Sequence, residues 1–132
     1  MTANIRFLNP TTLSKPPGYT HVVEITGPGR TVYIAGQLGL DAAGKLAGDP
    51  RAQIVQAFEN LKAALDAVGG SFNEVVKINN YLTDMSHLPI FREVREKYLN
   101  TKAPPASTTV AIAQLARDGA VFEIEAIVAL SA

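Results

Sequence analysis

Apolar residues recur at helical spacing over one long segment of the chain, residues 50–68. Successive members of this stripe are four, three, four and three positions apart: Ile54, Phe58, Leu61, Leu65 and Val68. Such spacing is typical of the buried face of an α-helix. Asp49 is a favourable N-cap, Pro50 suits the first helical position, and Gly69-Gly70 ends the helix. The pattern predicts an amphipathic helix that lies across a sheet.

A second, shorter helical pattern covers roughly residues 87–99. Its apolar face is formed by Leu88, Phe91, Val94 or Arg95, and Tyr98. Pro89 falls in the first turn, where a missing backbone N–H is tolerated. We therefore expect a second helix beside the first.

The C-terminal segment has the period of a β-strand. Its apolar face carries Phe122, Ile124 and Ala126. Glu123 and Glu125 alternate with these residues and fall on the opposite face. A β-branched run before it, residues 104–110, predicts another strand, whose start is held extended by Pro104-Pro105. The segment 115–119 connects the two.

Four further runs predict strands, at residues 4–8, 21–25, 31–35 and 74–82. The first is expected to be a short edge strand. The five residues 26–30 contain two glycines and suit an antiparallel hairpin between the second and third runs. A helix separates residues 31–35 from 74–82, which favours a parallel crossover.

These elements predict a single α+β domain spanning residues 1–132. We expect one mixed six-stranded sheet with two helices on one face. The other face would carry a mixture of apolar and polar groups, including Val22, Lys77, Asn79 and Glu123. A half-apolar face of this kind favours association with another surface.

Composition narrows the possible functions. Twelve basic residues balance twelve acidic ones, so the net charge provides no attraction to nucleic acid or to an anionic membrane. The absence of cysteine excludes disulfides and thiolate catalysis and fits a reducing cytoplasm. No apolar run approaches membrane-spanning length, and His21 and His87 lack the spacing of metal ligands. We expect a cytoplasmic protein that binds neither metal nor nucleic acid nor membrane.

Several short motifs occur in an order and spacing that together are specific. They are Tyr19, Ala35-Gly36-Gln37, Val68-Gly69-Gly70, Val75-Val76-Lys77, Tyr81-Leu82-Thr83-Asp84, Pro105-Ala106 and Glu123-Ile124-Glu125-Ala126. Through these motifs the chain resembles the YjgF/RidA family of reactive-intermediate deaminases over nearly its whole length. The resemblance implies a chorismate-mutase-like fold and a homotrimer whose three sheets form an inner barrel. It also implies small-molecule sites in clefts between neighbouring subunits.

The resemblance further implies hydrolysis of enamines and imines to a 2-oxo acid and ammonia, without a metal or cofactor. Active members hold the substrate carboxylate with an arginine that follows the Pro-Ala pair. This chain has Ser107 there. Loss of such a charge-assisted pair typically costs ~2–5 kcal/mol, so the chain departs from the usual 2-imino-acid deaminase at this position.

Other site positions follow from the same resemblance. Gly36 would let substrate approach the backbone, and Thr109 falls where backbone groups hold the carboxylate or the attacking water. Glu123 corresponds to the acid that positions water and transfers a proton, and Tyr19 to an aromatic wall. Arg92 stands where active members often have a neutral amide, which suggests that the anionic group of a ligand is held elsewhere.

Each of these residues also has a purely structural interpretation. Ser107 could satisfy a backbone group at a strand entry, Tyr19 could be a packed loop aromatic, and Gly36 could serve a bulge. One of the two glutamates could belong to a solvated or ion-paired face. The basic residues Arg92, Arg95 and Lys97 could form intrahelical pairs with neighbouring glutamates on an exposed helix surface.

Three functions remain open from the sequence. The first is a cofactor-free imine or enamine hydrolase in which Glu123 orients water. Its atypical substrate either lacks the usual carboxylate or binds it through Arg92 or Arg117. The second is a trimer that binds a small metabolite without turning it over. The third, an endoribonuclease, is disfavoured by the balanced charge and by the lack of a basic stripe interleaved with aromatics.

Overall fold

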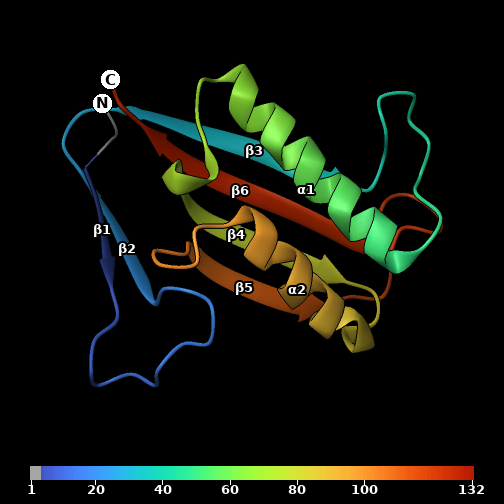
Figure 1. The fold of residues 1–132 in the computed structure, drawn as a ribbon, viewed down its shortest axis with the longest axis horizontal. Helices are drawn as coiled ribbons and strands as arrows, with labels where there is room; N and C mark the ends of the chain where they lie inside the picture. Colours follow the sequence, from blue (N-terminus) through green and yellow to red (C-terminus); the bar gives the residue numbers. More distant parts are fainter. Residues whose placement is uncertain (1–3) are drawn as a thin grey trace.

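The structure, a computed structural model, describes residues 4–132, so positions 1–3 of the predicted domain lie outside it. Its strands and α-helices are β1 (Asn4–Leu8), β2 (Val22–Thr26), β3 (Arg30–Leu38), α1 (Pro50–Ala67), β4 (Val75–Leu82), α2 (Leu88–Tyr98), β5 (Ala106–Ala111) and β6 (Phe122–Leu130). Two 3₁₀ helices, η1 (Phe72–Glu74) and η2 (Met85–His87), precede β4 and α2. Figure 1 shows this α+β arrangement, with α1 and α2 side by side over the strands. The predicted six strands and two α-helices are confirmed for the described chain.

Four strands form the main sheet, in the order β3-β6-β4-β5. β6 is antiparallel to both β3 and β4, and β4 is parallel to β5. β3 and β4 therefore run in the same direction with β6 between them, as the predicted crossover through α1 requires. The order leaves β3 and β5 as the two opposite edges of the sheet.

The six strands do not form one continuous sheet. β1 and β2 pair only with each other, from Asn4↔Thr26 to Leu8↔Val22, and stand beside the main sheet (Figure 1). The predicted hairpin between residues 21–25 and 31–35 is therefore wrong. β3 pairs instead with β6 along most of its nine residues, which gives it a longer ladder than β2 could offer.

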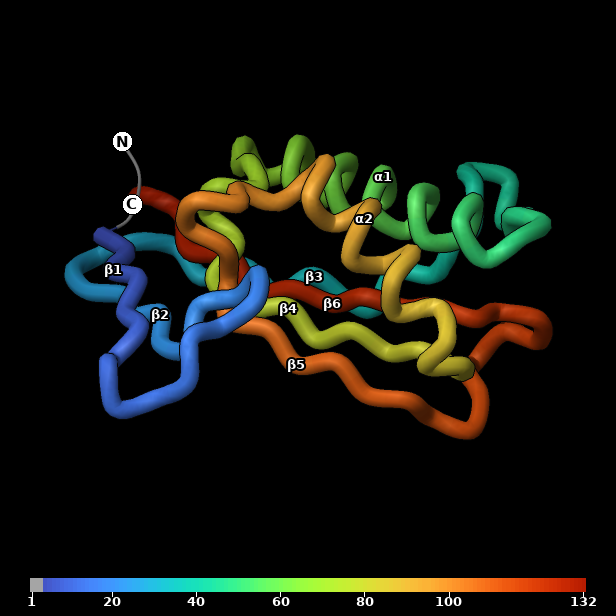
Figure 2. The backbone as a smooth tube through the Cα atoms, turned by 60° about the horizontal axis from the view of Figure 1, so that its bottom comes forward, coloured from blue at the N-terminus to red at the C-terminus, as the bar shows by residue number. Residues whose placement is uncertain are grey.

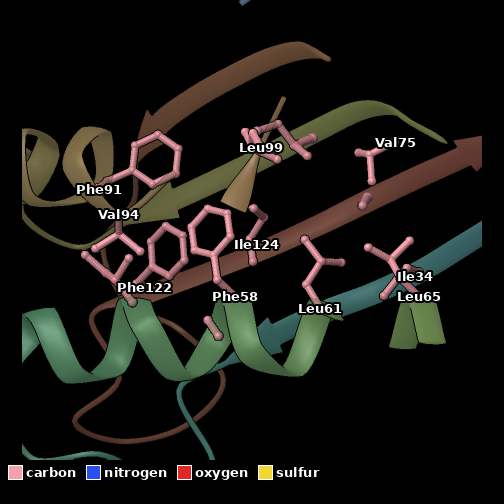
Figure 3. Packing of buried hydrophobic residues seen from close by; sticks show 14 of the residues in the cluster. Ile34, Phe58, Leu61, Leu65, Val75, Phe91, Val94, Leu99, Phe122 and Ile124 are labelled. Carbon is pink, nitrogen blue, oxygen red and sulfur yellow. The ribbon is translucent and has the colours of Figure 1, made fainter. Parts of the chain in front are cut away.

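Both helices cover the same face of the main sheet, as Figure 2 shows edge-on. The N-cap prediction for α1 is confirmed, since the Asp49 side chain accepts a hydrogen bond from the Ala52 N–H at 2.8 Å. Of the predicted stripe, Ile54, Phe58, Leu61 and Leu65 are buried and Val68 is half-buried. Figure 3 shows Phe58, Leu61 and Leu65 of this stripe meeting α2 and the strands in one apolar core.

The opposite face of the sheet carries no helix (Figure 2). The alternation in β6 is confirmed, because Phe122, Ile124 and Ala126 are buried under the helices while Glu123 and Glu125 point away. Tyr33 of β3 is 76% exposed on this open face. Lys77, Asn79 and Glu123 lie on it as predicted. Val22 does not, because it belongs to the separate β1-β2 pair.

Candidate functional site

The predicted site residues of one chain divide between two cavities. Four of them, Tyr19, Arg92, Ser107 and Thr109, line a cavity of about 380 Å³ between β5, α2 and the loop before β2. We call this the β5-side cavity. Gly36 and Glu123 line a second cavity of about 630 Å³ along β3 and α1, which we call the β3-side cavity.

The β5-side cavity is walled by hydroxyl groups whose positions are set by one buried amide. Asn80 of β4 is fully buried, and its Nδ2 lies 3.0 Å from Ser107 Oγ and 3.2 Å from Thr109 Oγ1. Since the amide NH₂ only donates, both hydroxyl oxygens accept from it, and their own hydrogens are free to point elsewhere. Ser107 thus contacts a side chain rather than the backbone group considered for a strand entry. Asn80 was not predicted as a site residue.

A second unpredicted residue of this cavity is Arg95. Its side chain lies on the buried face of α2, where the periodicity left the position open between Val94 and Arg95, and both are buried. Its Nη2 donates to the Pro17 carbonyl at 3.1 Å, and its guanidinium carbon lies 5.5 Å from the centre of the Phe91 ring. The interpretation of Arg95 as part of an exposed, ion-paired helix surface is therefore wrong. Arg92 is exposed but reaches the same cavity.

Tyr19 lies between the β5-side cavity and a neighbouring hollow of about 520 Å³ formed by the loop at residues 9–19 and by residues 101–104. Its ring packs edge-on against His21, with centroids 5.3 Å apart. It is at once a packed loop aromatic and a wall of the cavity.

In the β3-side cavity, Glu123 lies directly over Gly36. A Cβ built on Gly36 would stand only 2.6 Å from the Glu123 Cδ, so no larger residue fits without moving the carboxylate. Gly36 also falls inside a β-bulge, where the pairing of β3 with β6 shifts between Ile34 and Gln37. The absence of a side chain at Gly36 thus makes room for the Glu123 carboxylate of the same chain, as well as for any ligand that approaches the backbone.

The environment of Glu123 favours its protonated form. Burial raises the pKa of Glu123, and the nearby charge of Glu125 raises it further. Glu125 Oε1 in turn accepts hydrogen bonds from Tyr81 Oη at 2.9 Å and Asn79 Nδ2 at 3.0 Å. A carboxyl group with a raised pKa beside a cavity is suited to accept and return protons.

The two cavities lie at opposite edges of the sheet, because Ser107 and Thr109 are on β5 and Gly36 is on β3. Within one chain they do not form a common pocket. They can combine only if the β5 edge of one copy lies against the β3 edge of another. Among residues 4–132, no cluster of His, Cys, Asp or Glu could hold a metal ion, and no helix of this part of the chain is long and apolar enough to cross a membrane.

Comparison with known proteins identifies the family. Residues 12–130 match the profile of the family described as Endoribonuclease L-PSP. The chain belongs to the YjgF/RidA family. One RidA-family relative, a 2-iminobutanoate/2-iminopropanoate deaminase of Dermatophagoides farinae, is 32% identical over 114 residues, 85% of either chain.

Solved Rid structures share the fold. A Rid-family protein of unknown function from Yersinia pestis superposes with a TM-score of 0.82 at 32% identity, covering 96% of this chain and 99% of that one. RidA from an Antarctic Psychrobacter superposes with a TM-score of 0.73 at 40% identity, covering 89% and 92%. The resemblance inferred from the motifs and the α+β fold that it implies are confirmed.

Proposed function

We propose that this RidA-family protein hydrolyses small reactive imines or enamines to a carbonyl compound and ammonia. The observation that supports this most directly is the Glu123 carboxyl group, held over Gly36 with a raised pKa beside an open cavity. The name of the Dermatophagoides relative indicates the same reaction class. A cytoplasmic location, consistent with the absence of cysteine, belongs to the same proposal.

In the proposed reaction, water attacks the carbon of the C=N bond while Glu123 accepts one of its protons. Glu123 passes this proton to the nitrogen, which gives a carbinolamine. It then accepts the hydroxyl proton and transfers it to the nitrogen as the C–N bond breaks, so that a C=O group forms and ammonia leaves. One water is consumed and one ammonia is released, so no metal, cofactor or oxidant is needed. Glu123 acts first as base and then as acid, a role that suits a carboxyl with a raised pKa.

We further propose that each site is shared by two copies of a homotrimer. The division of the site residues between the two opposite edges of the sheet supports this arrangement, since a closed ring brings unlike edges together. The helix-free sheet face, with its exposed Tyr33, would then line the inside of the ring.

The alternative is a trimer that binds a metabolite without turning it over. The neutral hydroxyl at Ser107 favours it, because a serine cannot replace the charge of a carboxylate-binding arginine. The name of the matching family also mentions endoribonuclease activity. A net charge of zero and the lack of a basic stripe make that function the weakest candidate.

An ammonia-release assay tests the proposal. An amino-acid oxidase generates 2-iminobutanoate in the cuvette, and ammonia release is followed with wild type, Ser107→Arg and no added protein. We expect wild type to accelerate release above the spontaneous rate, with Ser107→Arg at least as fast. If wild type is inert on every imine tried and only the arginine variant is active, the binding alternative is correct.

A further inference from the structure

Arg95 is a buried arginine that forms no ion pair within the described part of the chain. Only 9% of its surface is exposed. In the described part of the chain, the ion pairs are Arg6–Glu24 and Arg51–Glu93, and neither involves Arg95. A buried charge without a counter-ion is unfavourable unless something binds to it. A gain in the stability of a single chain therefore does not explain why an arginine is buried at this position.

The surroundings hold the guanidinium in one place. The Pro17 carbonyl accepts from Nη2, and the Phe91 ring packs beside the group. Gly18 has a φ of +91°, and a Cβ there would collide with Nη2, so this loop is shaped to fit the arginine. Only one of the five guanidinium N–H groups is engaged by these contacts, which leaves most of the planar fork available.

The rest of the β5-side cavity offers donors and positive charge. Asn80 donates to Ser107 Oγ and Thr109 Oγ1, so the hydroxyl hydrogens of both residues can be given to a ligand. Arg92 supplies a second positive charge at the rim. No aspartate or glutamate is among the lining residues. The whole set is complementary to a small anion.

We propose that Arg95 is the carboxylate anchor of this site and binds the acid group of a small 2-imino acid, with Ser107 and Thr109 as supporting donors. A planar carboxylate matches the unused fork of the guanidinium. The substrate class rests on the proposed deaminase function, whereas the anchoring role is a property of the cavity alone. Arg95 thus supplies from α2 the positive charge that Ser107 cannot supply from β5.

The test measures binding rather than turnover. 2-Oxobutanoate, the stable oxo counterpart of 2-iminobutanoate, is titrated by calorimetry into wild type, Arg95→Gln, Arg95→Lys and the control Lys97→Gln. Lys97 lies on the same helix but is exposed, so the control removes the same charge. We expect Arg95→Gln to raise Kd about 30-fold or more, Arg95→Lys to raise it less, and Lys97→Gln to leave it unchanged.

Three further measurements extend the test, and the first two use wild type, so they keep it decisive if Arg95→Gln folds poorly. Wild type should bind the neutral 2-oxobutanamide at least 30-fold more weakly than the acid, roughly the worth of a buried charge-assisted pair. In wild type, the Arg95 Nε–H signal should shift when 2-oxobutanoate is added. The double variant Arg95→Gln/Ser107→Arg should recover affinity, because a guanidinium again enters the same cavity.

Three results would overturn the inference: equal Kd values for wild type and Arg95→Gln, equal affinity for the acid and the amide, or tighter binding of inorganic phosphate than of 2-oxobutanoate. Failure of the deaminase proposal looks different. In that case carboxylate binding depends on Arg95 while ammonia release stays at the spontaneous rate.

Discussion

Glu123→Gln is expected to lower kcat for imine hydrolysis by about 10²- to 10⁴-fold, the usual contribution of a positioned general acid–base. Glutamine keeps the size of the side chain over Gly36 but cannot accept a proton from water. The affinity for 2-oxobutanoate should change little, because we expect the carboxylate of this ligand to bind in the β5-side cavity and not beside Glu123. The measurement is steady-state ammonia release at saturating imine.

Glu96→Gln is the matched control, since Glu96 is exposed on α2 and lines neither cavity. It should retain wild-type turnover. If Glu123→Gln also retains it, Glu123 is not the acid–base and the proposed mechanism is wrong.

Glu123→Gln should also change how the stability of the protein depends on pH. Because the pKa of Glu123 is raised in the folded protein, the folded state binds its proton more tightly than the unfolded state does. The contribution of Glu123 to stability is complete below the ordinary carboxyl pKa of 4.5 and is lost as the pH rises through the folded value. Compared with wild type, Glu123→Gln should therefore gain Tm at neutral pH and show no such gain in acid.

The second large effect concerns the core. Phe58→Ala should lower the free energy of unfolding by about 3–5 kcal/mol, the usual cost of removing a buried aromatic ring. Phe58 is fully buried and stacks between Tyr98, at 5.1 Å, and Phe91 and Phe122, each at 6.2 Å (Figure 3 shows the three phenylalanines). Its loss leaves a cavity at the point where α1, α2 and β6 meet.

Urea unfolding at a fixed protein concentration measures this loss, since stability in an oligomer depends on concentration. Val55→Ala on the exposed side of α1 is the control and should change the free energy of unfolding by less than ~0.5 kcal/mol. A cost for Phe58→Ala as small as that of the control would contradict the assignment of this cluster as the core.

The sequence was most informative where local pattern and burial coincide. The stripe on α1 and the alternation in β6 need no knowledge of the rest of the chain, because each element has one buried face. The strand that pairs with β2 could not be predicted from a local pattern. A turn of suitable length follows it, but strand pairing is decided by competition with β6, which lies far away in sequence.

The candidate site shows the same limit. Residue types and motif order indicated Glu123, Gly36 and Ser107, but not that β6 and β4 separate the edges on which Gly36 and Ser107 lie. Arg95 was missed because charge periodicity assigned it to a solvated face. The available signal was its place on the apolar stripe of α2. Arg95 lies four positions after Phe91 and three positions before Tyr98, which is the spacing of one helix face.

A mixing experiment tests the shared site most directly. Glu123→Gln inactivates the half of the shared site that the β3-side cavity contributes. Ser107→Phe fills the half that the β5-side cavity contributes. Each variant alone should therefore be inactive. After the two are unfolded together and refolded in equal amounts, random assembly into a closed ring should restore about one quarter of wild-type ammonia release, since each site takes one half from each neighbour. Activity no higher than that of the separate variants would contradict a site shared between copies.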